Sequence, residues 1–403
     1  MPRQPTRPFY IFFLVLPSGI SNGFIAVVLP FLLTQKGFPV ATTAAIVAFG
    51  VSANIWRFVW GPVVDISLST RKWYWIGLLA CIVTLLSICF APFSAASYGL
   101  LSIVVFLSQV AATFILLPIN SIMANTIEEE QKGIASGWYQ AGSLAGTGLG
   151  GGAGLWLATH VNVGLSVIVL CGVSVLFGLF ILLTTDIPHD RQKKLGIQLK
   201  EMGKDLLVML RTPLSLYVII FLLMPVGTGA VSYLWSAIAQ DWRADADTVA
   251  LVTGLLSGGA SAIGCLLGGW MADRKGIWFA YFGCGLISAM IALCMAFLPM
   301  QPTVYITGVL AYAIATGMIY AAFTALVLFA TGKKHVATRF SLLCSLGNLP
   351  VVYMTAFNGW MHDKYDSRWM LIGEAVLGIS AVFVFMWLLR WVKNKERPRE
   401  TSR

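Results

Sequence analysis

Long apolar runs separated by short polar breaks fill almost the whole chain. A helix that crosses a bilayer needs about 20 apolar residues, and most of these runs reach that length. Strands of a membrane β-barrel instead alternate apolar and polar residues over roughly ten positions. The pattern therefore predicts an all-α membrane protein with twelve transmembrane helices. Their expected ranges are 9–33, 41–64, 73–93, 97–124, 134–158, 161–185, 213–239, 249–272, 277–299, 303–331, 336–361 and 369–392.

One long hydrophilic stretch, 186–212, interrupts this pattern at the centre of the chain. It carries charged residues such as Asp190 and Lys193, and we interpret it as an amphipathic cytoplasmic linker. Residues 1–185 are then expected to form an N-terminal six-helix bundle. Residues 213–403 are expected to form a C-terminal six-helix bundle with a basic cytoplasmic tail.

Composition agrees with a membrane protein and excludes a soluble one. Hydrophobic residues make up 58% of the 403 residues and charged residues only 11%, whereas soluble proteins carry roughly 25% charged residues. The seven cysteines are scattered through apolar runs, and the four histidines lack ligand spacing. Neither a disulfide framework nor a metal site is indicated, and we expect no cofactor.

The positions of lysine and arginine predict the orientation. With both termini on one side, that side carries 22 of the 27 basic residues, against four on the other side. Basic residues accumulate in cytoplasmic loops, so both termini are expected in the cytoplasm. The net charge of +10 fits an anionic inner leaflet. Nucleic-acid binding is disfavoured, because no polar domain exists to carry it.

The polar segments after the second and the eighth predicted spans repeat each other. The first contains Gly61 and Asp65, and the second contains Gly269 and Asp273, with the two aspartates 208 residues apart. Such parallel repeats are typical of one large class of transporters. A carboxylate here can bind the N-terminus of a neighbouring helix and hold the cytoplasmic side shut; ordinary loop charges are the alternative. The predicted gating residues are Asp65, Arg71, Gly269, Asp273, Arg274 and Lys275.

The second copy also carries a family resemblance. Its run Gly269-x-x-x-Asp273-Arg274-Lys275-Gly276 resembles the signature loop of the major facilitator superfamily. The stretches 57–65 and 337–343 are similar to the peptide/acetyl-CoA transporter group, which includes AmpG-type muropeptide permeases and related siderophore importers. The resemblance implies two pseudo-symmetric six-helix bundles, a monomer in the bacterial inner membrane, and proton-coupled symport of a muropeptide or a siderophore.

Two charged side chains lie well inside predicted spans, where ionisable groups are expensive and mark functional sites by default. Arg57, on the second span, is expected either to anchor an anionic substrate or to extend its guanidinium to the cytoplasmic surface. Glu374, on the twelfth span, is expected either to carry a proton or to have a packing or lipid-edge role.

Further polar and aromatic side chains predict a substrate cavity near the middle of the membrane. The seventh span is interrupted by Pro225, Gly227 and Gly229, and broken helices are pointers to binding sites in transporters. Hydrogen bonds between helices are the alternative for each single residue. The expected cavity residues are Asn22, Asn54, Arg57, Gln109, Tyr139, Gln140, Tyr233, Trp235, Tyr312, Tyr320 and Asn348.

Glycines crowd the fifth span, and the run 146–151 matches G-x-G-x-x-G. Dinucleotide binding would require a strand before this run and an aqueous βαβ unit, which the apolar pattern excludes. Dense glycines instead predict close packing between helices, together with a hinge.

Together these observations predict a secondary transporter that moves a small amphipathic solute across the lipid bilayer by alternating access. An exporter of amphipathic compounds or drugs, and a non-transporting membrane sensor of the same fold, remain alternatives. A membrane-embedded enzyme is disfavoured, because such enzymes need aspartates, histidines or cysteines clustered at one interface, and within the predicted spans only single acids occur.

Overall fold

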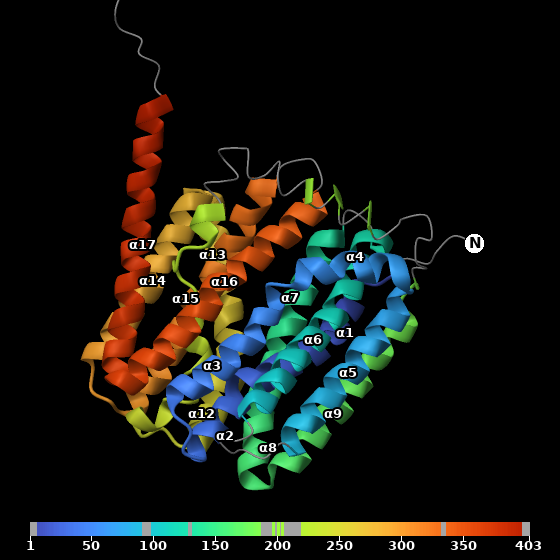
Figure 1. The fold of residues 1–403 in the computed structure, drawn as a ribbon, viewed down its shortest axis with the longest axis horizontal. Coiled ribbons are helices and arrows are strands. Elements are labelled where there is room, and N and C mark those ends of the chain that lie inside the picture. Colours follow the sequence, from blue (N-terminus) through green and yellow to red (C-terminus); the bar gives the residue numbers. More distant parts are fainter. Residues whose placement is uncertain are drawn as a thin grey trace, which may run out of the picture.

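The computed structural model describes residues 6–90, 98–127, 131–186, 196–197, 200–201, 203–204, 219–331 and 336–396. Within these ranges every regular element is helical. Figure 1 shows the helices of the first half of the chain (blue to green) beside those of the second half (yellow to red), with α3 lying against α16 between them. Most of the predicted linker lies outside the described residues.

The six segments of the first half follow the predicted spans closely. Three of them join two helices through a π-helical or 3-10 turn. The helices are α1 (Tyr10–Gly23), α2 (Leu29–Gln35), α3 (Val40–Val51), α4 (Arg57–Ser67), α5 (Thr70–Phe90), α6 (Tyr98–Thr126), α7 (Lys132–Gly148), α8 (Gly154–His160) and α9 (Val163–Gly178).

The described residues of the second half contain five long helical segments after the break in the seventh span. The helices are α12 (Ala246–Val249), which continues through a π-helical turn into α13 (Ser257–Lys275), then α14 (Ile277–Phe297), α15 (Pro302–Thr331), α16 (Val336–Lys364) and α17 (Ser367–Glu396). Across both halves, eight helices of the described part are long and apolar enough to cross a membrane. We call the end of the bundle where α4, α6 and α13 finish the inner end, and the end where α8 and α16 finish the outer end.

The seventh span is the main departure from the predicted helices. A helix was expected over 213–239, but within the described residues it ends by Met224. Pro225 lacks a backbone N–H, and Gly227 and Gly229 adopt positive φ angles of 57° and 67°, which a helix cannot accommodate. Only short 3-10 turns follow, at Ala230–Tyr233 and Ala239–Trp242.

Tyrosine hydroxyls satisfy the carbonyls that this break exposes. Tyr353 donates to the carbonyl of Leu223 at 2.9 Å, and Tyr281 donates to that of Val226 at 3.2 Å. Tyr305 donates to the carbonyl of Trp235 at 2.8 Å. Irregular backbone is tolerated at membrane depth where protein groups replace the lost helical bonds, and these hydroxyls from α14, α15 and α16 do so.

Close packing by the glycines of the fifth span is confirmed. A Cβ atom added to Gly150 would lie 2.1 Å from the carbonyl oxygen of Ile20 on α1. A Cβ atom added to Gly254 would lie 2.3 Å from the Cα atom of Gly152. Both distances are shorter than any carbon–oxygen or carbon–carbon contact allows, so only glycine lets these backbones meet. The second contact joins the two halves of the chain.

Candidate functional site

Side chains from both halves lie within electrostatic range of Tyr320 on α15. Its side chain is 58% exposed, although α4, α7 and α16 all contribute groups close to it. Arg57 and Tyr139 from the first half, and Cys344 from the second, lie near enough to act electrostatically on its hydroxyl. Tyr233, at the break in the seventh span, interacts with the same hydroxyl. More than half of Tyr320 is therefore accessible, within electrostatic range of groups from both halves.

We call Arg57, Tyr139, Tyr233, Tyr320 and Cys344 the central cluster. The ion pairs among the described residues belong to His160 and His362, so the guanidinium of Arg57 has no carboxylate partner there. Arginine binds carboxylates and phosphates through paired hydrogen bonds. Tyrosine supplies an apolar ring with a polar hydroxyl. This arrangement suits a solute that is partly aromatic or apolar and carries a negative charge.

The remaining predicted cavity residues divide by burial. Asn22, Asn54 and Asn348 are half-buried, and Gln140 is exposed. Three others are buried away from the central cluster in this conformation: Gln109, which contacts Ser21 at 3.5 Å, and Trp235 and Tyr312, whose rings pack edge to face. Tyrosine and tryptophan fill cores as well as cavities, and composition alone does not separate these uses.

Glu374 lies inside the second bundle, with only 9% of the residue exposed. Tyr312 donates a hydrogen bond to one of its carboxylate oxygens, and Asn358 donates to the other. The lipid-edge alternative for this residue is therefore wrong, and the side chain is held by α15 and α16. A small cavity of about 10 Å³, measured as space for the centre of a water molecule, lies beside the carboxylate against the break in the seventh span. That volume holds about one water.

The predicted gating residues lie differently from expectation. Asp65 and Asp273 were expected in loops, but α4 extends to Ser67 and α13 to Lys275, so both lie on helices. Their side chains lie outside the described part of the chain. Arg71 donates hydrogen bonds to the carbonyls of Leu182 and Thr184, within the first half.

The described residues of the second copy of the repeat show no contact across to the first half. The guanidinium of Arg274 lies over the ring of Trp270, 5.9 Å from its centre. Lys275 is exposed, and nothing lies within 4 Å of a Cβ atom added to Gly269. The cytoplasmic gate therefore stays a prediction.

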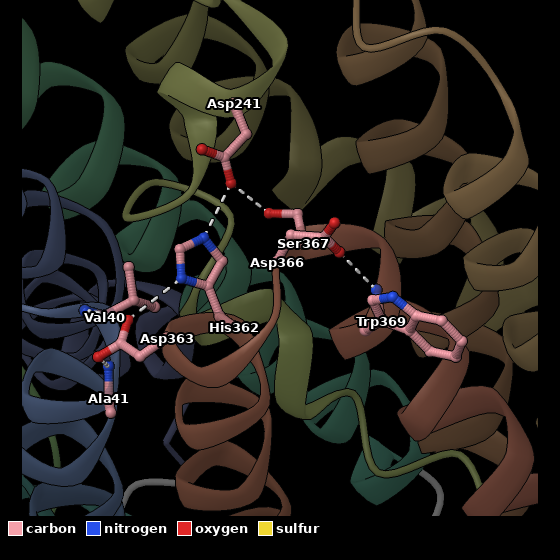
Figure 2. A network of polar contacts seen from close by, with 8 residues as sticks. All are labelled: Val40, Ala41, Asp241, His362, Asp363, Asp366, Ser367 and Trp369. Atoms are coloured by element: carbon pink, nitrogen blue, oxygen red, sulfur yellow. Dashed lines mark hydrogen bonds and ion pairs between the residues drawn. The ribbon is translucent and has the colours of Figure 1, made fainter.

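A polar network at the outer end joins the halves, and the sequence analysis missed it (Figure 2). Asp363 accepts hydrogen bonds from the backbone N–H groups of Val40 at 2.9 Å and Ala41 at 2.8 Å, the first residues of α3. His362 contacts Asp363 at 3.2 Å and Asp241 at 2.8 Å, and Ser367 also donates to Asp241. The histidines show no metal-ligand spacing, and nothing local in the sequence marks the adjacent His–Asp pair at the end of the eleventh span as a contact between the halves.

The outer end is closed in this conformation. Beside the contact between Asp363 and α3, a Cβ atom on Gly359 of α16 would lie 2.2 Å from the Cβ atom of Ala44 on α3. His160 on α8 also lies 3.5 Å from Asp247 on α12. Backbone contact and polar contact thus hold the two halves together on this side.

Comparisons with known proteins agree on one family. The family model described as the Major Facilitator Superfamily matches residues 11–354. A POT family transporter solved in complex with 5-aminolevulinic acid is similar over 94% of this chain and 95% of its own, with 12% identity and a TM-score of 0.72. No curated protein sequence matches significantly.

Two further solved structures resemble the chain equally well. A bacterial homologue of the human lysosomal transporter Spinster, inward-facing and unoccupied, has a TM-score of 0.73, 14% identity, and coverage of 95% of this chain and 96% of its own. A D-xylose–proton symporter has a TM-score of 0.72, 13% identity, and coverage of 94% and 96%. At these identities the likeness establishes the fold.

Proposed function

Because this chain belongs to the major facilitator superfamily, we propose that it is a secondary active transporter whose solute binds at the central cluster and crosses by alternating access. The family and its structural neighbours make the chain a transporter rather than an enzyme. The observation that carries the proposal is Tyr320, exposed between groups from both halves while the outer end is closed. A site bounded by both halves changes its access when they rock against each other.

The solute we propose is small, amphipathic and anionic. Arg57 supplies a positive charge with no carboxylate partner among the described residues, and Tyr139, Tyr233 and Tyr320 supply rings with hydroxyl groups. The resemblance of 57–65 and 337–343 to the peptide/acetyl-CoA transporter group favours import of a muropeptide or a siderophore. Export of an amphipathic compound requires the same site and remains the alternative.

We propose that Glu374 carries the coupling proton. A buried carboxylate is costly when ionised, so its charge depends on the hydrogen bonds that surround it. Tyr312 and Asn358 supply these bonds, and the cavity beside Glu374 reaches Gly227 and Thr228 at the break in the seventh span. Loss or gain of a proton on Glu374 would change its hydrogen bonds, next to the irregular backbone of the seventh span, which can move.

The chain is proposed to work as a monomer in the bacterial inner membrane with both termini in the cytoplasm. The basic residues favour this orientation. Both sides of the central cluster come from one chain, so a second copy is not needed to complete the site. The division at 186–212 into two six-helix bundles belongs to the same proposal.

Uptake into membrane vesicles tests the site. A panel of labelled muropeptides, ferric siderophores and anionic dyes should reveal a transported solute, and Arg57→Gln should raise its KM by about tenfold to a hundredfold, since a hydrogen bond to a charged group is worth about 1.5–3 kcal/mol. Arg368→Gln removes an exposed arginine at the outer end and serves as the control. An unaltered KM in Arg57→Gln would contradict binding at the central cluster.

A further inference from the structure

Both ring nitrogens of His362 face carboxylate oxygens, as Figure 2 shows. Nε2 lies 2.8 Å from Oδ2 of Asp241, and Nδ1 lies 3.2 Å from Oδ1 of Asp363. A neutral imidazole has one N–H group and one lone pair, so it would turn the lone pair towards one of the carboxylates. The imidazolium donates to both. The geometry therefore fits the charged form of the ring.

Because of the position of Asp363, the protonation of His362 depends on whether the outer end of the transporter is closed or open. Its Oδ1 atom accepts the N–H group of Val40, and its Oδ2 atom accepts that of Ala41. The first N–H groups of a helix have no partners within the helix, and they favour a negative charge. As long as α3 holds both oxygens, Asp363 cannot turn away from the His362 ring. Once α3 moves away, the carboxylate of Asp363 is free to rotate. The lone pair of a neutral His362 ring then no longer has to face a carboxylate oxygen.

We propose that His362 is a proton-binding site whose occupancy holds the outer end of the protein closed. This inference rests on the alternating-access function proposed above. His362 lies at the outer end, on the far side of the closed contact from the central cluster, so its proton enters and leaves from the outside. The proton therefore controls opening of the outer end and is not itself transported, in contrast to the proton on Glu374.

The charges around His362 also favour its protonated form. Burial alone would lower the pKa of His362, but the hydrogen bonds and charges of Asp241 and Asp363 outweigh it and raise the pKa above its ordinary value of 6.5. Burial alone would raise the pKa of Asp241, yet hydrogen bonds from His362 and Ser367, with the His362 charge, lower it below 3.8. These groups come from the 3-10 turn at 239–242, α16 and α17.

The sign of the pH dependence follows from these shifts. The contribution of His362 to closure is complete below the ordinary histidine pKa and is lost as the pH rises through the raised value. The contribution of Asp241 is present above 3.8 and is lost only as the pH falls through its lowered value. Closure is therefore firmest in mildly acidic surroundings, and a rise in external pH opens the outer end.

Double electron–electron resonance measures the distance between two spin labels. It can follow the opening of the outer end without a known solute. Labels are attached through Lys36→Cys and Gln301→Cys, two exposed outer-end positions in opposite halves, after the seven native cysteines are replaced by serine. The labelled protein in lipid nanodiscs is measured between about pH 5 and about pH 9, the range in which histidine titrates. A longer distance should gain population as the pH rises, with about a tenfold change in the open-to-closed ratio for each unit by which the pKa of His362 differs between the states.

Three variants decide between the outcomes. His362→Gln keeps one donor without a charge and should abolish the pH response, whereas His160→Gln should retain it. Asp363→Asn removes the charge that binds α3 and should populate the open state at every pH. A pH response that survives in His362→Gln, a wild-type distance that does not vary with pH, or an Asp363→Asn protein that stays closed would each overturn the proposal. Solute binding at Arg57 is measured separately by uptake and would stand in any of these cases.

Discussion

Arg57 and Glu374 are both charged residues within the membrane, yet the fold treats them in opposite ways. Arg57 lies half-buried beside Tyr139 and Tyr320, with no carboxylate partner among the described residues. Glu374 is sealed inside the second bundle, and both of its oxygens accept hydrogen bonds from side chains. One charge is left for a ligand, whereas the other is already satisfied by the protein.

The space around each residue strengthens this contrast. More than half of Tyr320 in the central cluster is exposed. The cavity beside Glu374 holds about one water. A cavity of that size has no room for a solute, in keeping with the proposal that Arg57 binds the solute and Glu374 carries the proton.

Glu374→Gln should produce the largest effect. The amide has almost the same shape but cannot ionise, so accumulation of solute against its gradient should be lost completely while exchange of solute across the membrane continues. Uptake driven by an imposed proton gradient, compared with counterflow in the same vesicles, measures the two activities. Glu201→Gln makes the same chemical change at an exposed position and should behave like the wild type. Accumulation that persists in Glu374→Gln would remove this residue from the coupling mechanism.

A pair of tyrosine variants should produce an intermediate effect and separate the two sites. Tyr320→Phe removes a hydroxyl from the central cluster and should weaken solute binding about twofold to tenfold, the value of one hydrogen bond. Tyr312→Phe removes the hydroxyl that donates to Glu374 and should impair accumulation while leaving binding affinity unchanged. Equilibrium binding and accumulation, measured on both variants, test the separation. Equal losses of affinity in the two variants would mean that the sites are not distinct.

The sequence predicted the helices well because an apolar run of sufficient length can form few structures other than a membrane-spanning helix. It also singled out Arg57, Tyr139, Tyr233 and Tyr320, since polar groups are conspicuous in apolar spans, and their part in solute binding stays a prediction. The predicted seventh helix extends to residue 239, too far along the chain, because the helix ends by Met224. Pro225 marks a break, but the extent of the irregular backbone depends on tyrosine hydroxyls that arrive from three other helices.

Long-range contacts account for the residues that were missed or misjudged. Asp363 binds Val40 across 323 positions in the chain, and no local periodicity reports such a contact. Trp235 and Tyr312 are of residue types that often line cavities, but the fold packs their rings against each other. Whether an aromatic residue faces a core or a cavity is decided by the neighbouring helices, which a single span does not specify.

The smallest effect is expected from Asp247→Asn at the outer end, and it sharpens the rule that surroundings decide what a charge does. His160 and Asp247 lie 3.5 Å apart, but their side chains are 43% and 60% exposed, and exposed ion pairs contribute about 0–1 kcal/mol. The variant should change the open-to-closed ratio of the spin-labelled protein by no more than about fivefold, and high salt should abolish the difference. Asp363 instead binds two backbone N–H groups directly, so Asp363→Asn should change the ratio more. If Asp247→Asn opened the outer end further than Asp363→Asn, the His160–Asp247 pair and not the network around Asp363 would hold the halves together.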